Sequence, residues 1–207
     1  HDYERTGRIL PREIKDFPWE VDEPIGSKFG YLNEIHYKSA ELLIHRLIDT
    51  VSMNGVFMLN LSPLADGTIP QAQQDRLLEI GKWLAVNGEA IRGTRAWHRY
   101  GEGPFYDAPP AAALDDAPGE HYGADEIRFT TKDGVLYAIV TGWPENGEVV
   151  IKSLAKGAPN ADGIAEVSIL GNDGKLAFVQ DAEGLKVKFP ATKPCDYAFS
   201  LKIIGAH

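Results

Sequence analysis

The feature that most constrains the fold is the apolar run from Val56 to Leu61, which lies between two stretches of helical periodicity. The run lacks the regular alternation of a half-exposed strand, so we expect a strand covered on both faces, as in a parallel sheet between helices. Asn60 interrupts the run near its end, and turn-forming residues follow as far as Gly67. Ligands bind at this end of the strands in α/β folds. Asn60 and Asp66 are therefore candidates for a binding site, with the alternative that they only satisfy the backbone of the loop.

The two helical stretches have recognisable ends. Ser39 is placed to cap the first helix, and Asn54-Gly55 is a typical helix end. The apolar residues of this helix recur at helical spacing: Leu43, Ile44, Leu47, Ile48 and Val51. Thr68 to Gln71 predicts a capping box for the second helix, with Pro70 at its first position, and Asn87-Gly88 predicts its end. Helix, strand and helix in this order predict an α/β fold.

The chain changes character after Trp97. Residues 101–125 are rich in Gly, Pro, Ala and Asp, which predicts an irregular loop or linker. About seven short strands separated by turns follow, which is the pattern of an antiparallel β-sandwich. The expected strands are Glu126–Thr131, Val135–Thr141, Glu148–Ser153, Glu166–Leu170, Lys175–Val179, Leu185–Phe189 and Tyr197–Ile204. We therefore divide the chain into an α/β segment at 1–92, a linker at 93–125 and a β-sandwich at 126–207, and expect Trp97, Phe129 and Tyr137 to pack the sandwich against the α/β segment.

Composition excludes several classes of function. A formal net charge of -9 argues against a nucleic-acid partner, because phosphate binding needs a basic surface. The single cysteine, Cys195, cannot form an internal disulfide, and the histidines lack metal-ligand spacing, so we expect no metal and no cofactor. His45 is expected to pack in its helix or lie at the surface. No apolar stretch has membrane-spanning length and no signal peptide is seen, so no membrane partner is expected. The chain begins with His1, so an upstream segment is expected to have been removed or left out.

The tetrapeptide Phe17-Pro18-Trp19-Glu20 is the strongest candidate for chemistry. The indole of Trp19 would cover the apolar face of a pyranose while the carboxyl group of Glu20 reaches the glycosidic oxygen, which is the geometry of general acid catalysis. Phe29, in the aromatic stretch Phe29-Gly30-Tyr31, would add to such a sugar site. The alternative is that Trp19 belongs to the core and Glu20 is an exposed charge in a loop.

Five blocks stand in order along the chain: PWE, IGSKFGY, NGVFMLNLSPLADGTIP, RLLEIGKWLAVNGEAIRGTRAW and EIRFTTKDGVLYAIVTGWPENGEVVI. Together they resemble the C-terminal part of an α-L-fucosidase of glycoside hydrolase family 29, from about Asp2 to the end of the chain. The resemblance implies α/β plus all-β: the last units of a (β/α)8-like barrel followed by a C-terminal antiparallel β-sandwich. It also implies a hydrolase of terminal α-L-fucosyl groups on oligosaccharides or glycoconjugates. A periplasmic or extracellular location is implied in the same way, with a cytoplasmic location left open.

The same resemblance implies the catalytic and binding residues. The family is retaining, so two carboxylates about 5 to 5.5 Å apart act as nucleophile and acid/base. Family members place the acid/base either at the Trp-Glu pair, which matches Glu20, or about fifteen residues earlier, which matches Glu4. Of these we favour Glu20, with Glu4 as the rival. Trp19, Phe29 and Asn60 are the expected substrate-binding residues.

Other motifs of the family are missing from the sequence. The family nucleophile, an Asp after a Trp on an earlier strand, does not occur here, nor does its Asn-Asp-Arg-Trp segment. A second carboxylate would have to come from one of the nearby acids or from a neighbouring subunit. These acids are Asp2, Glu4, Asp22, Glu23 and Asp66. An incomplete barrel also leaves a strand edge open, so we expect a homo-oligomer or a complementary barrel segment to cover it. The alternative function is a noncatalytic carbohydrate-binding or structural remnant.

Overall fold

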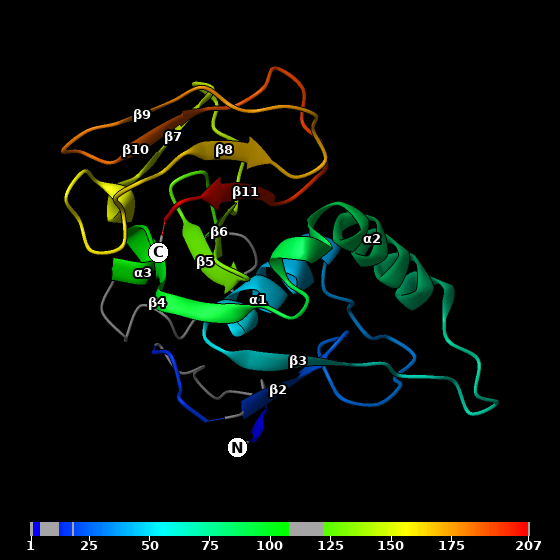
Figure 1. Ribbon diagram of the computed structural model, residues 1–207. Coiled ribbons are helices and arrows are strands. Elements are labelled where there is room, and N and C mark those ends of the chain that lie inside the picture. The colour runs from blue at the N-terminus through cyan, green and yellow to red at the C-terminus, as the bar shows by residue number, and fades with distance from the viewer. Residues whose placement is uncertain (1, 5–12, 18, 108–121, 207) are drawn as a thin grey trace.

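The computed structural model describes residues 2–4, 13–17, 19–107 and 122–206 (Figure 1). In the first part, three parallel strands form a sheet in the order β1-β2-β3, with bounds Asp2–Glu4, Trp19–Pro24 and Gly55–Asn60. Helix α1 (Ala40–Ser52) connects β2 to β3, and α2 (Gln71–Asn87) follows β3. The expected helix, strand and helix are therefore confirmed.

The ends of the helices confirm one sequence prediction and contradict another. Ser39 caps α1, because its Oγ accepts a hydrogen bond from the N–H of Leu42 at 3.1 Å. Helix α1 ends just before Asn54, which adopts a left-handed conformation (φ 67°) that asparagine tolerates well. The capping box predicted for α2 is wrong: Pro70 precedes the helix as its N-cap residue, without a side-chain cap. Proline has no polar side chain to cap the helix, and Pro70 contributes its fixed φ angle and its carbonyl oxygen, which accepts from the N–H of Gln74 at 3.2 Å.

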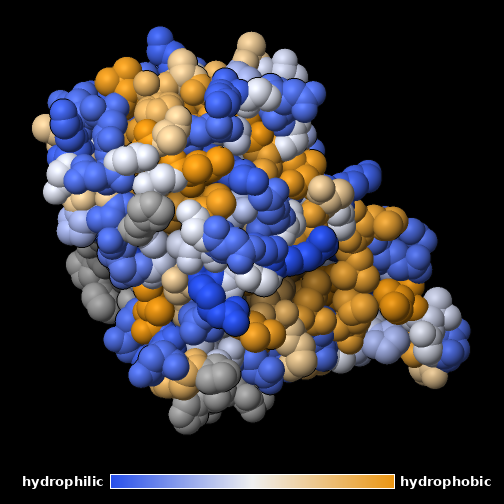
Figure 2. Space-filling view, viewed as in Figure 1, coloured by the Kyte–Doolittle hydropathy of each residue, from blue (hydrophilic) through white to orange (hydrophobic). Residues whose placement is uncertain are grey.

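Strand β3 is not covered on both faces, so that prediction is also wrong. Val56 is 59% exposed and Met58 is 45% exposed, whereas Phe57 between them is half-buried. Side chains alternate between the two faces of a strand, so Val56 and Met58 share one face. We call the sheet face that carries Val56 and Met58 the open face. Figure 2 shows hydrophobic atoms gathered over α2 and towards β3 on the same side of the molecule.

The second part of the chain forms two antiparallel sheets within the described residues. The larger has the order β4-β5-β6-β11-β8 and the smaller the order β7-β10-β9. Their bounds are β4 Arg95–Glu102, β5 Ile127–Lys132, β6 Val135–Val140, β7 Glu148–Ile151, β8 Glu166–Ile169, β9 Phe178–Gln180, β10 Leu185–Lys188 and β11 Phe199–Ile204, with α3 at Pro104–Asp107 and short 3-10 helices at Gly88–Ala90 and Lys152–Leu154. One core lies between the two sheets, as expected for a sandwich.

The predicted linker is wrong for Arg95–Glu102, because β4 pairs with β5 and forms an edge of the larger sheet. Its register shifts between Ala96 and Gly101, and a Cβ on Gly101 would lie 2.7 Å from the Ile127 carbonyl oxygen. The irregular pairing explains why this strand lacks a clear sequence pattern. The rest of the predicted linker includes 108–121, which lie outside the described residues.

The larger sheet is buried on both faces. On β6, Leu136, Ala138 and Val140 face the core between the sheets. Tyr137 and Ile139 face the other way, where they pack with Ile44 and Ile48 of α1 and Trp83 of α2. The indole N–H of Trp83 also donates to the carbonyl oxygen of Ala198 at 2.8 Å. These apolar contacts hold the α/β part against the sandwich.

The expectation for the three aromatic residues at this interface was correct for Tyr137 alone. Trp97 and Phe129 lie between the two sheets, with their ring centroids 5.0 Å apart. Phe129 is on the face of β5 that points away from the helices, which alternation along the strand requires once its neighbour Arg128 points towards α1.

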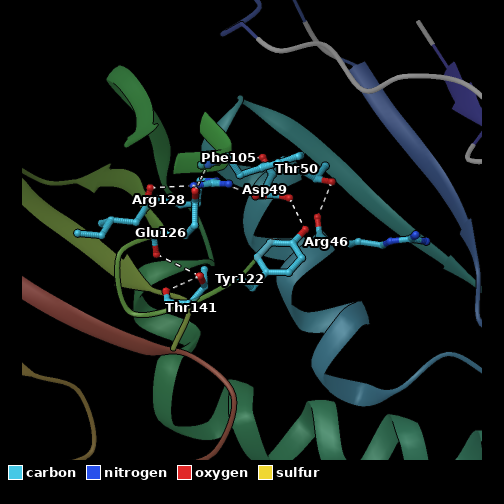
Figure 3. A network of polar contacts seen from close by, with 11 residues as sticks. Arg46, Asp49, Thr50, Phe105, Tyr122, Glu126, Arg128 and Thr141 are labelled. Carbon is cyan, nitrogen blue, oxygen red and sulfur yellow. Dashed lines mark hydrogen bonds and ion pairs between the residues drawn. The ribbon is translucent and has the colours of Figure 1, made fainter. Parts of the chain in front are cut away.

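A buried ionic network crosses the same interface (Figure 3). Arg128 of β5 lies 2.7 Å from Asp49 of α1 through its Nε and 2.9 Å from Glu126 through its Nη1. The hydroxyl of Tyr122 donates to the other oxygen of Asp49 at 2.7 Å. Burial lowers the pKa of Arg128, but the Asp49 and Glu126 charges outweigh this effect and raise it above its ordinary value. Burial raises the pKa of Glu126, although the Arg128 charge opposes the shift.

Candidate functional site

Strand β2 separates its side chains between the two faces of the parallel sheet. Trp19, Val21 and Glu23 are buried on the face that packs against α1 and the sandwich. Glu20 and Asp22 are half-buried, and their Cα partners on β3 are Val56 and Met58. Paired residues of neighbouring parallel strands lie on the same face, so both carboxylates belong to the open face.

Trp19 is on the opposite face from Glu20. Its indole is 2% exposed and donates its N–H to the carbonyl oxygen of Met53 at 3.0 Å. The ring lies directly on Gly55, where a Cβ would be 2.4 Å from the indole. Val21, Met53 and Tyr100 complete this cluster. The structure therefore places Trp19 as a core residue and does not bring it together with Glu20, unlike the sugar-stacking position expected from the sequence.

Glu20 and Glu4 occupy different heights in the sheet. Glu20 is the second residue of β2 and pairs with Val56, near the amino end of β3. Glu4 is the last residue of β1 and is the Cα partner of Asp22. Its backbone is thus two positions closer to the carboxyl end of the sheet than Glu20. The side chains of Asp2 and Glu4 lie outside the described residues.

Asn60 and Phe29 are found at the carboxyl end of the sheet. Asn60 ends β3, is half-buried, and accepts a hydrogen bond at its carbonyl oxygen from the N–H of Ile25 at 3.0 Å. Phe29 is 37% exposed in the loop that follows β2. The loop after β2 and the loop after β3 thus lie at the same end of the sheet, which is the end where ligands bind in α/β folds.

Two of the acids offered as a second carboxylate have other roles. Glu23 is fully buried on the face of β2 opposite to Glu20, where it is ion-paired with Arg46 and with Lys38 at 2.9 Å. Asp66 accepts a hydrogen bond from the N–H of Thr68 at 2.9 Å, and this bond holds the pKa of Asp66 below its ordinary value. Asp66 therefore satisfies the loop backbone, and Asp22 is the described acid that shares the open face with Glu20.

Sequence reasoning missed Lys38, Arg46 and Gln73, which fix the loops at this end of the sheet. Arg46 is a buried charged residue of α1, next to apolar residues such as Ile44 and Ile48, and Gln73 is fully buried near the start of α2. A charged or amide residue within an apolar helix face signals a buried polar partner, because such groups are rarely buried alone. That signal was present for Arg46 but did not identify the partner.

His45 packs in the interior, which is one of the two positions, packed or at the surface, expected from the sequence. Its ring stacks on Tyr122 with the centroids 4.2 Å apart, and burial lowers the pKa of His45 to about 4. In the described part of the chain, no group of three His, Cys, Asp or Glu side chains is placed to hold a metal ion. Among the same residues, no helix is long and apolar enough to cross a membrane.

Comparisons with known proteins agree along most of the chain. The model of the family Alpha-L-fucosidase matches residues 1–89, and that of the Alpha-L-fucosidase C-terminal domain matches residues 122–204. The tissue alpha-L-fucosidase of Mus musculus is 29% identical over 210 residues, which cover 97% of this chain and 41% of the relative. The tissue alpha-L-fucosidase of Homo sapiens is 28% identical, and the match covers 98% of this chain and 40% of the relative.

Solved structures give the same result. An alpha-L-fucosidase structure superimposes on this chain with a TM-score of 0.78 at 29% identity. The match covers 98% of this chain and 42% of the solved chain. The alpha-fucosidase of Thermotoga maritima gives a TM-score of 0.74 at 30% identity. This match covers 94% of this chain and 41% of the solved chain. The chain thus spans about 40% of the length of the relatives it matches. Both family models and similarity along nearly the whole chain show that it belongs to glycoside hydrolase family 29, the α-L-fucosidases, and corresponds to their C-terminal part.

Proposed function

We propose that this chain supplies part of the (β/α)8-like catalytic barrel, and the acid/base carboxylate, of a retaining α-L-fucosidase. Such an enzyme releases terminal α-L-fucosyl groups from fucosylated oligosaccharides or glycoconjugates. The support is membership of the family together with a parallel sheet whose open face carries carboxylates. The alpha-fucosidase of Thermotoga maritima, a relative at 29% identity, has been solved in complex with fucose.

The position of Glu4 in the sheet favours it as the acid/base over Glu20. Catalytic residues of barrel enzymes lie at the carboxyl ends of the strands, and Glu4 ends β1 whereas Glu20 begins β2. The acid/base carboxyl group would donate its proton to the glycosidic oxygen while a nucleophilic carboxylate attacks the anomeric carbon. In the second step it would take a proton from the water that cleaves the glycosyl-enzyme bond.

We propose that the nucleophile is not one of the carboxylates of this chain. Asp22 is two residues from Glu20 on the same face, and its backbone pairs with Glu4. Neighbouring strands are about 4.8 Å apart, so Asp22 is close enough to Glu4 to influence the charge at the site. The resemblance nevertheless places the nucleophile on an earlier barrel strand, and we propose that Asp22 is not that residue.

The test compares Glu4→Ala with Glu20→Ala in the protein that contains this chain. Loss of the acid/base should reduce hydrolysis of a natural fucoside by about 10² to 10⁴, since its leaving group needs a proton. Hydrolysis of an aryl α-L-fucoside with an acidic phenol should fall much less in the first step. Added azide should then restore turnover by attacking the glycosyl-enzyme in place of activated water.

We expect this pattern for Glu4→Ala, with Glu20→Ala retaining most of its activity on both substrates. The reverse pattern would assign the acid/base to Glu20, as the sequence alone suggested. Release of no fucose by the unsubstituted protein, with binding of fucose intact, would favour the noncatalytic alternative. Asp66→Ala serves as the matched control, because this carboxylate holds a turn.

We also propose that the open face is covered in the working protein. Val56 and Met58 are large apolar side chains with high exposure, and contiguous exposed apolar surface usually marks a contact. A complementary barrel segment would pair with the edge of β3 that has no partner among the described strands, and would bury both residues. A second copy of the chain is the alternative cover.

A further inference from the structure

The loop between β2 and α1 is closed at its base by the side chain of Lys38. Its Nζ lies 2.7 Å from the carbonyl oxygen of Pro24 and 2.8 Å from that of Gly26. The same nitrogen lies 2.9 Å from Oε1 of Glu23. A lysine ammonium has three N–H donors, so these acceptors use all of them. The base of the loop is therefore fixed to the end of β2 by one residue.

The carboxylate that Lys38 contacts is itself held in place. Glu23 is fully buried at the end of β2, and Arg46 of α1 donates to the same Oε1. A buried carboxylate is stable only with its partners present, because removing them leaves an uncompensated charge in the interior. The strand, the loop base and the helix thus have one relative arrangement that satisfies all of these charges.

Backbone hydrogen bonds continue this closure into the loop. The N–H of Lys38 donates to the carbonyl oxygen of Ile25, and the N–H of Ser27 donates to that of His36, both at 2.9 Å. Residues 27–36 therefore project beyond a closed base, and we call them the loop tip. Its large apolar side chains are exposed: Phe29, Tyr31 and Leu32. Exposed aromatic residues on a loop with an anchored base are typical of ligand contacts.

The loop after β3 is tied to the same base through Gln73 of α2. The side chain of Gln73 is fully buried, accepts from the N–H of Ser62 at 2.9 Å and donates to its carbonyl oxygen at 2.8 Å. Its Nε2 also lies 3.1 Å from the hydroxyl of Tyr37, next to Lys38. One amide thus joins the two loops that follow neighbouring strands.

From these contacts we infer that Lys38, supported by Gln73, is a positioning residue for substrate binding. Its three hydrogen bonds fix the loop tip, and Phe29 with it, at the carboxyl end of the sheet where Asn60 ends β3. Lys38 acts through the loop and touches no reacting atom. The inference rests on the proposed function for its kinetic consequence, whereas the anchoring of the loop can be measured without any activity.

The first measurement is hydrogen exchange in Lys38→Met, which keeps the length of the side chain and removes its donors. The backbone amides of residues 27 and 38 should exchange about tenfold faster or more. Without the ammonium, opening the base of the loop costs less free energy, because fewer hydrogen bonds must break. Lys186→Met is the matched control. Lys186 on β10 is also held by two carboxylates, Asp181 at 2.8 Å and Glu183, but lies in the smaller sheet. Lys186→Met should leave the exchange rates of the loop amides unchanged.

The second measurement separates binding from chemistry. In Lys38→Met, KM for an α-L-fucoside should rise about tenfold or more, with kcat at saturation changed by less than about threefold, since a misplaced contact weakens binding before it alters proton transfer. Loss of the acid/base should show the opposite split. Tyr37→Phe, which removes one hydroxyl, should raise the same KM and the same exchange rates by about two- to fivefold.

The outcomes distinguish the inference from the function on which it rests. Unchanged exchange at the loop amides in Lys38→Met overturns the inference whatever the activity. Raised exchange with an unaltered KM overturns it as well, because the loop would then be anchored for a purpose other than binding this substrate. Absence of α-L-fucoside hydrolysis in the unsubstituted protein overturns the proposed function instead, and leaves the exchange result as a test of the anchoring.

Discussion

Replacing Arg128 by methionine removes the cation that two buried carboxylates share, and we expect a large loss of stability. Arg128 is fully buried, with its nitrogens 2.7 Å from Asp49 and 2.9 Å from Glu126. Removing one partner of a buried ion pair costs about 3 to 5 kcal/mol. For a chain of this size each kcal/mol lowers the midpoint of thermal unfolding by about 2 to 4 °C, so the midpoint should fall by about 6 to 20 °C.

Lys175→Met is the matched control for this prediction. Lys175 also lies 2.7 Å from a carboxylate, that of Glu166, but its side chain is 71% exposed. Exposed ion pairs contribute about 0 to 1 kcal/mol, so this variant should unfold close to the unsubstituted protein. Thermal unfolding followed by tryptophan fluorescence measures both variants, since Trp83 lies at the interface that Arg128 crosses.

The stability lost in Arg128→Met should depend on pH through Glu126. Burial already raises the pKa of Glu126, with the Arg128 charge opposing the shift, so removing Arg128 should raise the pKa of Glu126 further. The folded variant then holds a proton that the unfolded chain releases near its ordinary pKa of about 4.3. A raised folded-state pKa means stability that is present at low pH and lost as the pH rises through that value. The deficit of Arg128→Met should therefore narrow as the pH falls from about 8 to about 5.

Equal unfolding midpoints for Arg128→Met and Lys175→Met would refute the reasoning about the buried network. A deficit that grows as the pH falls would refute the assignment of Glu126 as the group left without its cation. Asp49→Asn should be less severe than Arg128→Met, because the arginine keeps Glu126 as a partner.

The remaining predictions concern packing and association. Gly55→Ala should lower stability by about 1 to 3 kcal/mol, since its Cβ would lie 2.4 Å from the Trp19 ring. Gly81→Ala, inside α2 with nothing within 4 Å of the added Cβ, should raise stability by about 0.5 to 1 kcal/mol, and an equal response of the two glycines in urea denaturation would contradict this account. The unsubstituted chain should self-associate through the open face, and Met58→Lys should shift light scattering towards the mass of a monomer. A stable monomer of the unsubstituted chain at micromolar concentration would disprove that expectation.

Much of the fold was predictable because local patterns and tertiary structure agree. Ser39 caps α1 as expected, and the strands from β5 to β11 lie within a few residues of the predicted ones. Short strands separated by glycine-containing turns leave few alternative arrangements. Two predictions failed for local reasons. The N-cap of α2 is Pro70, two residues after the Thr68 that a capping box would need, and β4 pairs through an irregular register that no periodicity reveals.

The candidate site was only partly predictable from the sequence. Adjacent residues in a strand point to opposite faces, so Trp19 and Glu20 could not both face one sugar once β2 formed. The sequence pattern at 19–24 does not show which face is buried, since that depends on α1 and β4. Contacts such as Lys38 with Glu23 or Gln73 with Ser62 depend on where the chain returns after a loop, and no spacing rule gives that distance.

The two-sided burial of the larger sheet limits how this protein can be divided. Alternate residues of β6 belong to different interiors: Leu136 and Ala138 fill the sandwich, while Tyr137 and Ile139 fill the contact with the helices. A sandwich cut away by itself would expose this second face to water, with the apolar side chains of Tyr137 and Ile139 and the charge of Arg128. Any chimaera that transplants this sheet onto another catalytic unit must therefore carry α1 and α2 with it, or replace their apolar surfaces residue for residue.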